Sequence, residues 1–224
     1  MITFLKDAWV KRIENEKSIK VVNPCPTGWL EKKLNEKEMD YLWRCIDKRG
    51  KASVKDVLAG HIKGSYALTD KSDWFFLHVI KPLIYVYEQK FRDLGRGATP
   101  LLSKKYPYEM QTWWVNYQKQ NEFNPFHDHA GVYSFVIWMK IPTHHDKQNL
   151  SNDANTDRIS LFEFHWIDII GNFFSTPYML DPSSEGTMLL FPAKLNHQVY
   201  PFYNCDEERI TISGNITLNT ARAI

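Results

Sequence analysis

The sequence predicts a mainly β protein with supporting helices, of the β-sandwich or jelly-roll class. Two helical stretches come first, and at least seven short strands separated by turns follow them. Many short strands bounded by Gly, Pro, Asn and Asp are typical of sandwiches and barrels. The 224 residues fit one domain, in which residues 1–105 form a mostly helical support and residues 106–224 form the jelly-roll core.

Composition excludes several classes of function. Hydrophobic residues make up 43% of the chain, and the net charge of +2 gives no reason to expect a nucleic-acid surface. Cys25, Cys45 and Cys205 form no C-x-x-C pair, which favours a reducing, cytoplasmic setting without disulfides. No apolar run approaches the roughly 20 residues that span a bilayer. We therefore expect an intracellular protein without a membrane or nucleic-acid partner.

The first half of the chain contains the first predicted helix. A short edge strand is expected at residues 19–22. A helix is expected over 35–47, because Asn35 is a good N-cap and apolar residues recur there at helical spacing. Such a stripe is far more often a core-facing surface than a binding site. Residues 48–71 are polar and are expected to form a loop with one short helix.

A second, longer helix is predicted from Ser72, as its cap, to about Asp93. Gly95 would close this helix, since glycine readily adopts the left-handed conformation that follows many helices. Pro82 lies inside the segment and should kink it, because proline lacks a backbone N–H. Together the two helices are expected to brace one face of the sheet.

The second half reads as strands, expected at residues 107–118, 132–141, 161–168, 173–180, 186–191, 197–200 and 209–213. In the first strand, Trp113, Val115 and Tyr117 share one face, and Trp114 and Asn116 share the other. The alternation alone does not decide which face lines a pocket. Residues 143–160 are polar and are interpreted as a mobile, solvated loop, or alternatively as a substrate lid.

The first candidate site is His127-Asp128-His129, just before the buried strand at 132–141. In an extended backbone His127 and His129 point to one side and Asp128 to the other. Two neutral imidazoles on one side can chelate a metal ion such as iron, zinc, copper or nickel. A local bulge would instead turn Asp128 inward and supply a carboxylate ligand.

The second candidate site lies near the C-terminus. His197 begins one strand, and Arg209, Thr211 and Ser213 share a face of the next strand along the chain. An arginine with a hydroxyl beside it makes a planar binder for a carboxylate. We therefore expect a metal site with an anion-binding clamp next to it.

These motifs together resemble the Fe(II)/2-oxoglutarate-dependent dioxygenase superfamily. The sequence has a His-x-His opening at 127–129, an FP…H-x-V-x-PF segment at 191–202, and an R-x-T-x-SGN ending at 209–215. The pattern is most similar to a branch of phage and marine sequences, with prolyl hydroxylases among its characterised relatives. The resemblance covers about half of the chain.

The resemblance implies a role for each matching residue. His127 and His197 match the two metal histidines, and Arg209 matches the residue that pairs with the distal carboxylate of 2-oxoglutarate. Thr211 matches its hydroxyl partner, and Tyr117 lies where some relatives place a second contact to 2-oxoglutarate.

Position 129 departs from the superfamily, because most members carry a carboxylate there. Alternation favours a site of three histidines, with His129 rather than Asp128 as the third ligand.

The activity implied is hydroxylation of a substrate with Fe(II), 2-oxoglutarate and O2, giving succinate and CO2. Peptidyl proline is one candidate substrate, and the sequence does not specify it. Two alternatives are a cupin-like three-histidine metalloprotein that does not use 2-oxoglutarate, and a non-catalytic β-sandwich that serves as a binding module. Arg209 distinguishes the first alternative, because that chemistry does not need it.

Overall fold

The computed structural model describes residues 27–95, 106–150 and 156–222, so the strand expected at 19–22 lies outside the described residues. The strands are β1 (Leu30–Lys33), β2 (Gly64–Ala67), β3 (Tyr108–Gln118), β4 (Asn124–His127), β5 (Tyr133–Lys140), β6 (Leu161–Ile167), β7 (Phe173–Met179), β8 (Thr187–Pro192), β9 (Asn196–Val199) and β10 (Arg209–Leu218). The helical segments are α2 (Glu36–Asp47), η1 (Lys55–Val57), η2 (Lys71–Asp73), η3 (Phe76–Ile80), α3 (Lys81–Lys90), α5 (His145–Leu150) and η4 (Pro182–Ser184).

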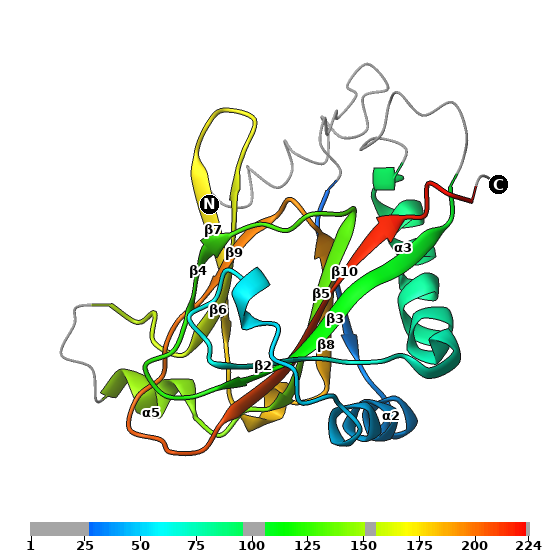
Figure 1. The fold of residues 1–224 in the computed structure, drawn as a ribbon. Coiled ribbons are helices and arrows are strands. Elements are labelled where there is room, and N and C mark those ends of the chain that lie inside the picture. The colour runs from blue at the N-terminus through cyan, green and yellow to red at the C-terminus, as the bar shows by residue number, and fades with distance from the viewer. Residues whose placement is uncertain (1–26, 96–105, 151–155, 223–224) are drawn as a thin grey trace.

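The described strands form two antiparallel sheets (Figure 1). One sheet has the order β1-β8-β5-β10-β3-β2, and the other has the order β4-β9-β6-β7. Along the chain, β3 to β10 divide equally between the two sheets, so that β8-β5-β10-β3 faces β4-β9-β6-β7. This is the connectivity of a double-stranded β-helix, or jelly roll. The predicted fold class is confirmed.

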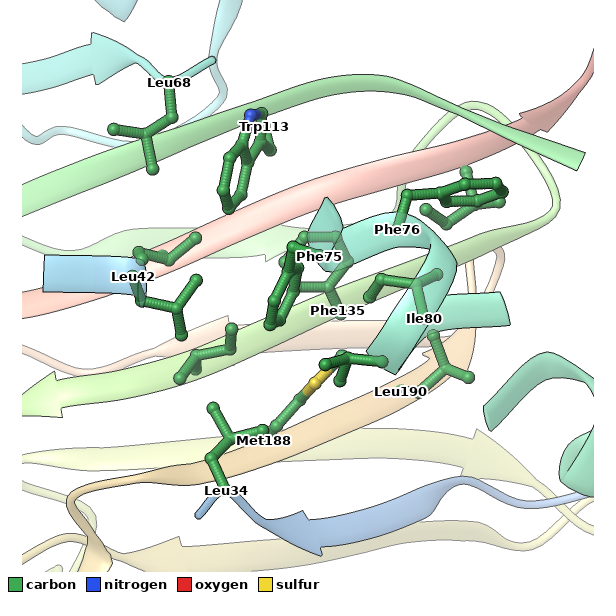
Figure 2. Packing of buried hydrophobic residues seen from close by; sticks show 14 of the residues in the cluster. Leu34, Leu42, Leu68, Phe75, Phe76, Ile80, Trp113, Phe135, Met188 and Leu190 are labelled. Atoms are coloured by element: carbon green, nitrogen blue, oxygen red, sulfur yellow. The ribbon is translucent and has the colours of Figure 1, made fainter. Parts of the chain in front are cut away.

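The main hydrophobic core lies between the helices and the larger sheet. Phe75, Phe76 and Ile80 of the helical side pack over Phe135 and Leu190 of the sheet (Figure 2). Figure 1 shows α2 and α3 on this side of the sheet. Burial of such side chains contributes about 1.5–3 kcal/mol each, which makes the large sheet a rigid support for the opposite face.

The sequence did not decide which face of β3 lines a pocket, and the structure does. Trp113 and Val115 are buried in the helix-side core, and Tyr117 packs against the same core. Trp114 and Asn116 therefore point between the two sheets, where they line a pocket.

Helix α2 begins where the sequence predicts. The side chain of Asn35 accepts a hydrogen bond from the Glu38 N–H, and the Glu38 carboxylate accepts one from the Asn35 N–H. This reciprocal capping box satisfies two N–H groups that a helix start leaves unpaired. Leu42 and Ile46 are buried, which confirms the core-facing stripe.

The start of the second helix differs from the prediction. Ser72 makes no capping bond and has a φ of 57°. The Asp70 carboxylate instead accepts hydrogen bonds from the Phe75 and Phe76 N–H groups. Aspartate caps helices as well as serine does, and Asp70 lies two residues before Ser72.

A kink was expected at Pro82; the structure has a π-helical turn, η3, that ends two residues before it, and Pro82 lies in the first turn of α3. Proline donates no backbone hydrogen bond, so the preceding turn widens into the pattern in which the Lys81 N–H reaches the Phe76 carbonyl. The helix ends at Lys90 rather than near Asp93. No helix among the described residues is both long and apolar enough to cross a bilayer.

Segment 48–71 contains a short helix, η1, as expected, and both this segment and 143–160 also contain regular structure that was not expected. Strand β2 lies in 48–71 and pairs with β3 from Gly64 to Ala67, a tertiary contact that its short sequence does not indicate. Helix α5 lies in 143–160, where the Gln148 amide donates to the Tyr203 carbonyl and accepts from the Tyr203 N–H. A helix this short depends on such contacts rather than on its own propensity.

Candidate metal and cosubstrate site

Strands β4 and β9 place two histidines opposite each other. His127 and His197 are direct partners in the strand register. Nδ1 of His127 lies 2.6 Å from the Pro125 carbonyl oxygen, and Nδ1 of His197 lies 2.9 Å from the Leu195 carbonyl oxygen. A protonated Nδ1 that donates to a carbonyl leaves the Nε2 lone pair free, which is the arrangement found in histidine metal ligands.

His129 completes a cluster of three. Its Nε2 lies 3.1 Å from Nε2 of His197, and one ligand atom from each of His127, His129 and His197 lies within 4.8 Å of the others. The backbone N–H of His129 donates to the Ala193 carbonyl at 2.8 Å, which fixes the segment after β4. The three ring nitrogens are close enough to share one ion.

The cluster favours neutral imidazoles. Burial lowers the pKa of His127. Burial, together with the nearby His127 ring, lowers the pKa of His129 to about 4. Burial and both neighbouring rings hold the pKa of His197 well below its ordinary value. All three rings are therefore neutral at pH 7, the form that binds a metal.

Asp128 lies outside the cluster. Its carboxylate is 3.3 Å from the Lys194 ammonium, and its side chain is 42% exposed. The backbone alternation that the sequence predicts for residues 127–129 thus agrees with the observed geometry. The cluster among the described residues consists of three histidines rather than two histidines and a carboxylate.

Arg209, at the start of β10, lines the same pocket as the three histidines. Its side chain is fully buried, and the guanidinium lies 5.0 Å from the centre of the Phe202 ring. Nη2 donates to the carbonyl and the hydroxyl of Ser160, whereas Nε and Nη1 have no hydrogen-bond partner. Burial lowers the pKa of Arg209 to about 9, which still leaves it charged at pH 7.

A buried, unpaired guanidinium is costly, because the protein replaces few of its lost contacts with water. Among the described residues, no carboxylate lies within ion-pair distance of Arg209. An anionic group in the pocket would satisfy both the charge and the free N–H donors. The arrangement therefore fits a carboxylate ligand.

The pocket has a volume of about 280 Å³ and lies between the two sheets. Thr211 and Ser213 line it from β10, as the alternation predicts. The Asn116 amide contacts the Thr211 hydroxyl at 3.5 Å and accepts from the Ser65 hydroxyl at 2.7 Å. Residues 57–60 add an apolar wall, and the pocket also reaches Trp114.

Tyr117, expected near the cosubstrate, is not brought to this pocket. It lies on the other face of β3, where its ring contacts the Arg49 guanidinium at 4.8 Å from the ring centre. Side chains of one strand alternate, so Tyr117 cannot face the same side as Asn116. Asn116 lines the pocket from β3 instead. Strand alternation already grouped Asn116 with Trp114, but nothing in the sequence identified Ser160.

The residues present fit both a metal ion and a 2-oxo acid. Three neutral imidazoles offer ligand nitrogens, and the same pocket holds a cation whose Nε and Nη1 donors are free. The two features lie in one pocket, with the Thr211 hydroxyl also in its lining.

Comparison with solved structures gives matches at low sequence identity. A prolyl-4-hydroxylase from Pseudomonas putida is 12% identical, with a TM-score of 0.46 over 85% of this chain and 92% of that one. The viral collagen prolyl hydroxylase of Paramecium Bursaria Chlorella virus-1 is 14% identical, with a TM-score of 0.47 over 88% and 98%. HygX from Streptomyces hygroscopicus, solved with nickel, 2-oxoglutarate and hygromycin B, is 8% identical, with a TM-score of 0.47 over 87% and 84%.

No curated protein matches the chain in sequence. Residues 112–215, slightly less than half of the chain, match the family model described as "Putative 2OG-Fe(II) oxygenase". This stretch contains the three histidines and Arg209. The match confirms the resemblance to the Fe(II)/2-oxoglutarate-dependent oxygenase superfamily that the motifs indicated.

Proposed function

We propose that this protein is an oxygenase that uses Fe(II) and 2-oxoglutarate to hydroxylate a substrate. One observation carries the proposal: a fully buried arginine with free donors shares a pocket with three neutral histidines. His127, His129 and His197 would hold the metal, and Arg209 with Thr211 would hold the distal carboxylate of 2-oxoglutarate. Bound together, iron and 2-oxoglutarate supply O2 activation, with succinate and CO2 as products.

The chain's own contribution is to bind, orient and exclude water. The carbonyls of Pro125 and Leu195 fix two of the imidazole rings through Nδ1 and direct Nε2 inward. Phe202 and Ser160 fix the guanidinium. Apolar side chains such as Trp138, Phe162 and Phe191 also line the pocket, and an apolar surrounding would strengthen the pairing of Arg209 with a carboxylate.

Replacing Arg209 tests the cosubstrate assignment. Removing one partner of a buried charge pair costs about 2–5 kcal/mol, so Arg209→Gln should weaken 2-oxoglutarate binding by roughly 30-fold or more. Binding is measured by anaerobic calorimetry on the metal-loaded protein. Metal affinity should stay the same, and the exposed Arg44→Gln on α2 serves as control. Equal 2-oxoglutarate affinity in Arg209→Gln and the wild type would refute the assignment.

The three-histidine set favours one second candidate, a cupin-like metalloprotein that runs other oxygen chemistry without 2-oxoglutarate. A missing carboxylate leaves the bound metal more positive than in a site of two histidines and one carboxylate. That candidate predicts tight metal binding that is insensitive to 2-oxoglutarate. Under that candidate function, Arg209 would have no ligand to bind. A prolyl peptide is the first substrate to test for the principal proposal.

A further inference from the structure

Ser160 contacts Arg209 through two different atoms. It is fully buried and lies immediately before β6. Its hydroxyl and its carbonyl both accept a hydrogen bond from Nη2 of Arg209. Because the hydroxyl accepts from the guanidinium, its own proton is free for the Thr143 hydroxyl, whose oxygen lies 3.1 Å away. Thr143 and Ser160 thereby join the two ends of segment 143–160 beneath the guanidinium.

The backbone of Ser160 is held in an unfavourable conformation. Its φ of 63° lies in the left-handed region, which residues other than glycine adopt at a cost. The Ser160 N–H donates to the Pro201 carbonyl at 2.9 Å, which helps to hold this turn. Strained residues persist where the surroundings fix them, and they gather at functional sites. Here the turn lets two acceptors of one residue reach the same nitrogen.

Building on the proposed function, we propose that Ser160 is a positioning residue for the cosubstrate carboxylate. Ser160 fixes one end of the guanidinium and Phe202 covers its face. Nε and Nη1 are then the donors left for a ligand. A guanidinium that is already oriented loses less conformational freedom when the carboxylate arrives. Ser160 acts through Arg209 and does not itself touch the reacting atoms.

Ser160→Gly distinguishes the contribution of the Ser160 hydroxyl from that of the Ser160 backbone carbonyl. Glycine accepts the left-handed φ and keeps the carbonyl acceptor, so the variant removes the side chain with its hydroxyl and leaves the backbone acceptor in place. A hydrogen bond to a charged group is worth about 1.5–3 kcal/mol, which predicts an increase of roughly tenfold or more in the Kd for 2-oxoglutarate. The Kd is measured by anaerobic calorimetry on the metal-loaded full chain. Metal affinity should not change.

A shorter ligand gives a readout that a structural defect would not produce. 2-Oxobutyrate has the same 2-oxo acid head but no distal carboxylate, so its affinity should be equal in the wild type and Ser160→Gly. Ser134→Ala is the matched control, because it removes another buried hydroxyl, one that contacts Asn215 at 2.9 Å. In this control the preference for 2-oxoglutarate over 2-oxobutyrate should stay at the wild-type value.

Three outcomes would overturn the inference. An unchanged 2-oxoglutarate affinity in Ser160→Gly would show that the hydroxyl does not position Arg209. An equal loss for both 2-oxo acids would show a general structural defect. A wild-type protein that binds metal but not 2-oxoglutarate would overturn the proposed function as well, so the two failures are distinguishable.

Discussion

At the scale of single residues, Arg209 has an environment that the protein alone does not satisfy. Its charge is fully buried, and two of its nitrogens have no partner. Evolution commonly keeps such groups at a cost in stability, because they serve binding.

Arg209→Met should raise the stability of the ligand-free protein, although the residue is fully buried. Replacing buried ionic groups by apolar ones of similar volume often stabilises a protein by about 1–4 kcal/mol. The lost bonds to Ser160 reduce this gain, so we expect ~1 kcal/mol, measured by urea unfolding. The same variant should lose the thermal stabilisation that 2-oxoglutarate gives the metal-loaded wild type. A strongly destabilised Arg209→Met would mean that Arg209 is a structural residue.

Gly131 controls the turn that follows the histidine motif. Its φ is 97°, and a Cβ there would lie 2.6 Å from the Ile216 carbonyl oxygen. Gly131→Ala should cost at least ~2 kcal/mol and weaken metal binding, because the backbone next to His129 must shift. Gly171→Ala is the control, since Gly171 has a φ of 87° but no atom within 4 Å of the added Cβ. Equal unfolding free energies for the two variants would contradict a steric role for Gly131.

The types and spacing of the residues in the sequence predicted part of the candidate metal and cosubstrate site. The three histidines and Arg209 follow from their spacing and from strand alternation. The resemblance suggested Tyr117 as a second contact to 2-oxoglutarate, but Tyr117 lies on the face of β3 that turns away from the pocket. Alternation groups the residues of β3 without stating which group meets the pocket. Ser160 belongs to a polar stretch whose composition is that of a solvated loop, and only tertiary packing shows that it is fully buried.

At the scale of elements, the start of the second helix allows a direct test of which residue caps it. Asp70→Ala should destabilise the protein by about 1–2 kcal/mol, because the Phe75 and Phe76 N–H groups lose their acceptor. Ser72→Ala should change the unfolding free energy by less than ~0.5 kcal/mol, since Ser72 makes no capping bond. Chemical denaturation of both variants provides the comparison. A larger loss of unfolding free energy in Ser72→Ala than in Asp70→Ala would instead identify Ser72 as the cap.

Elements with strong local signals were predicted from sequence, and elements that depend on partners were not. Helix α2 carries its own cap and stripe, and β5, β8 and β10 carry apolar or alternating runs. Strand β2 has only four residues and exists through its pairing with β3. Helix α5 has six residues and is fastened to Tyr203 by Gln148.

At the scale of the whole molecule, a buried carboxylate ties the strands of the smaller sheet together. Glu163 of β6 accepts hydrogen bonds from Gln198 of β9 and from Tyr200, and pairs with Arg158. Its side chain is only 1% exposed. Burial opposes its ionisation, but bonds from Ser175, Gln198 and Tyr200 and the charge of Arg158 outweigh that effect, so the pKa of Glu163 is lowered.

This network predicts how stability depends on pH. A carboxylate whose pKa is lower in the folded state stabilises the protein above its unfolded value of about 4.3, and the effect is lost as pH falls through the folded pKa. In Glu163→Gln the unfolding free energy should be lower at pH 7 and fall less steeply on acidification. Urea unfolding from pH 7 to pH 3 measures this, with the exposed Glu36→Gln as control. Parallel curves for wild type and Glu163→Gln would contradict the assignment.

The arrangement of the whole molecule was predicted as a class rather than in detail. The count of short strands indicates a sandwich, and the resemblance narrows it to a double-stranded β-helix. The pairing of His127 with His197 across β4 and β9 arises from long-range register, which hydrophobic alternation within each strand does not specify.

The central claim is that the three histidines and Arg209 act as one site for a metal and 2-oxoglutarate. The most direct measurement is an anaerobic titration of the metal-free protein with Fe(II) and then 2-oxoglutarate, followed in the visible region. We predict a weak charge-transfer band that needs both additions and is absent in His197→Ala. Iron binding without any band on adding 2-oxoglutarate would contradict the claim and favour other three-histidine oxygen chemistry. Failure to bind iron would reject the enzyme assignment.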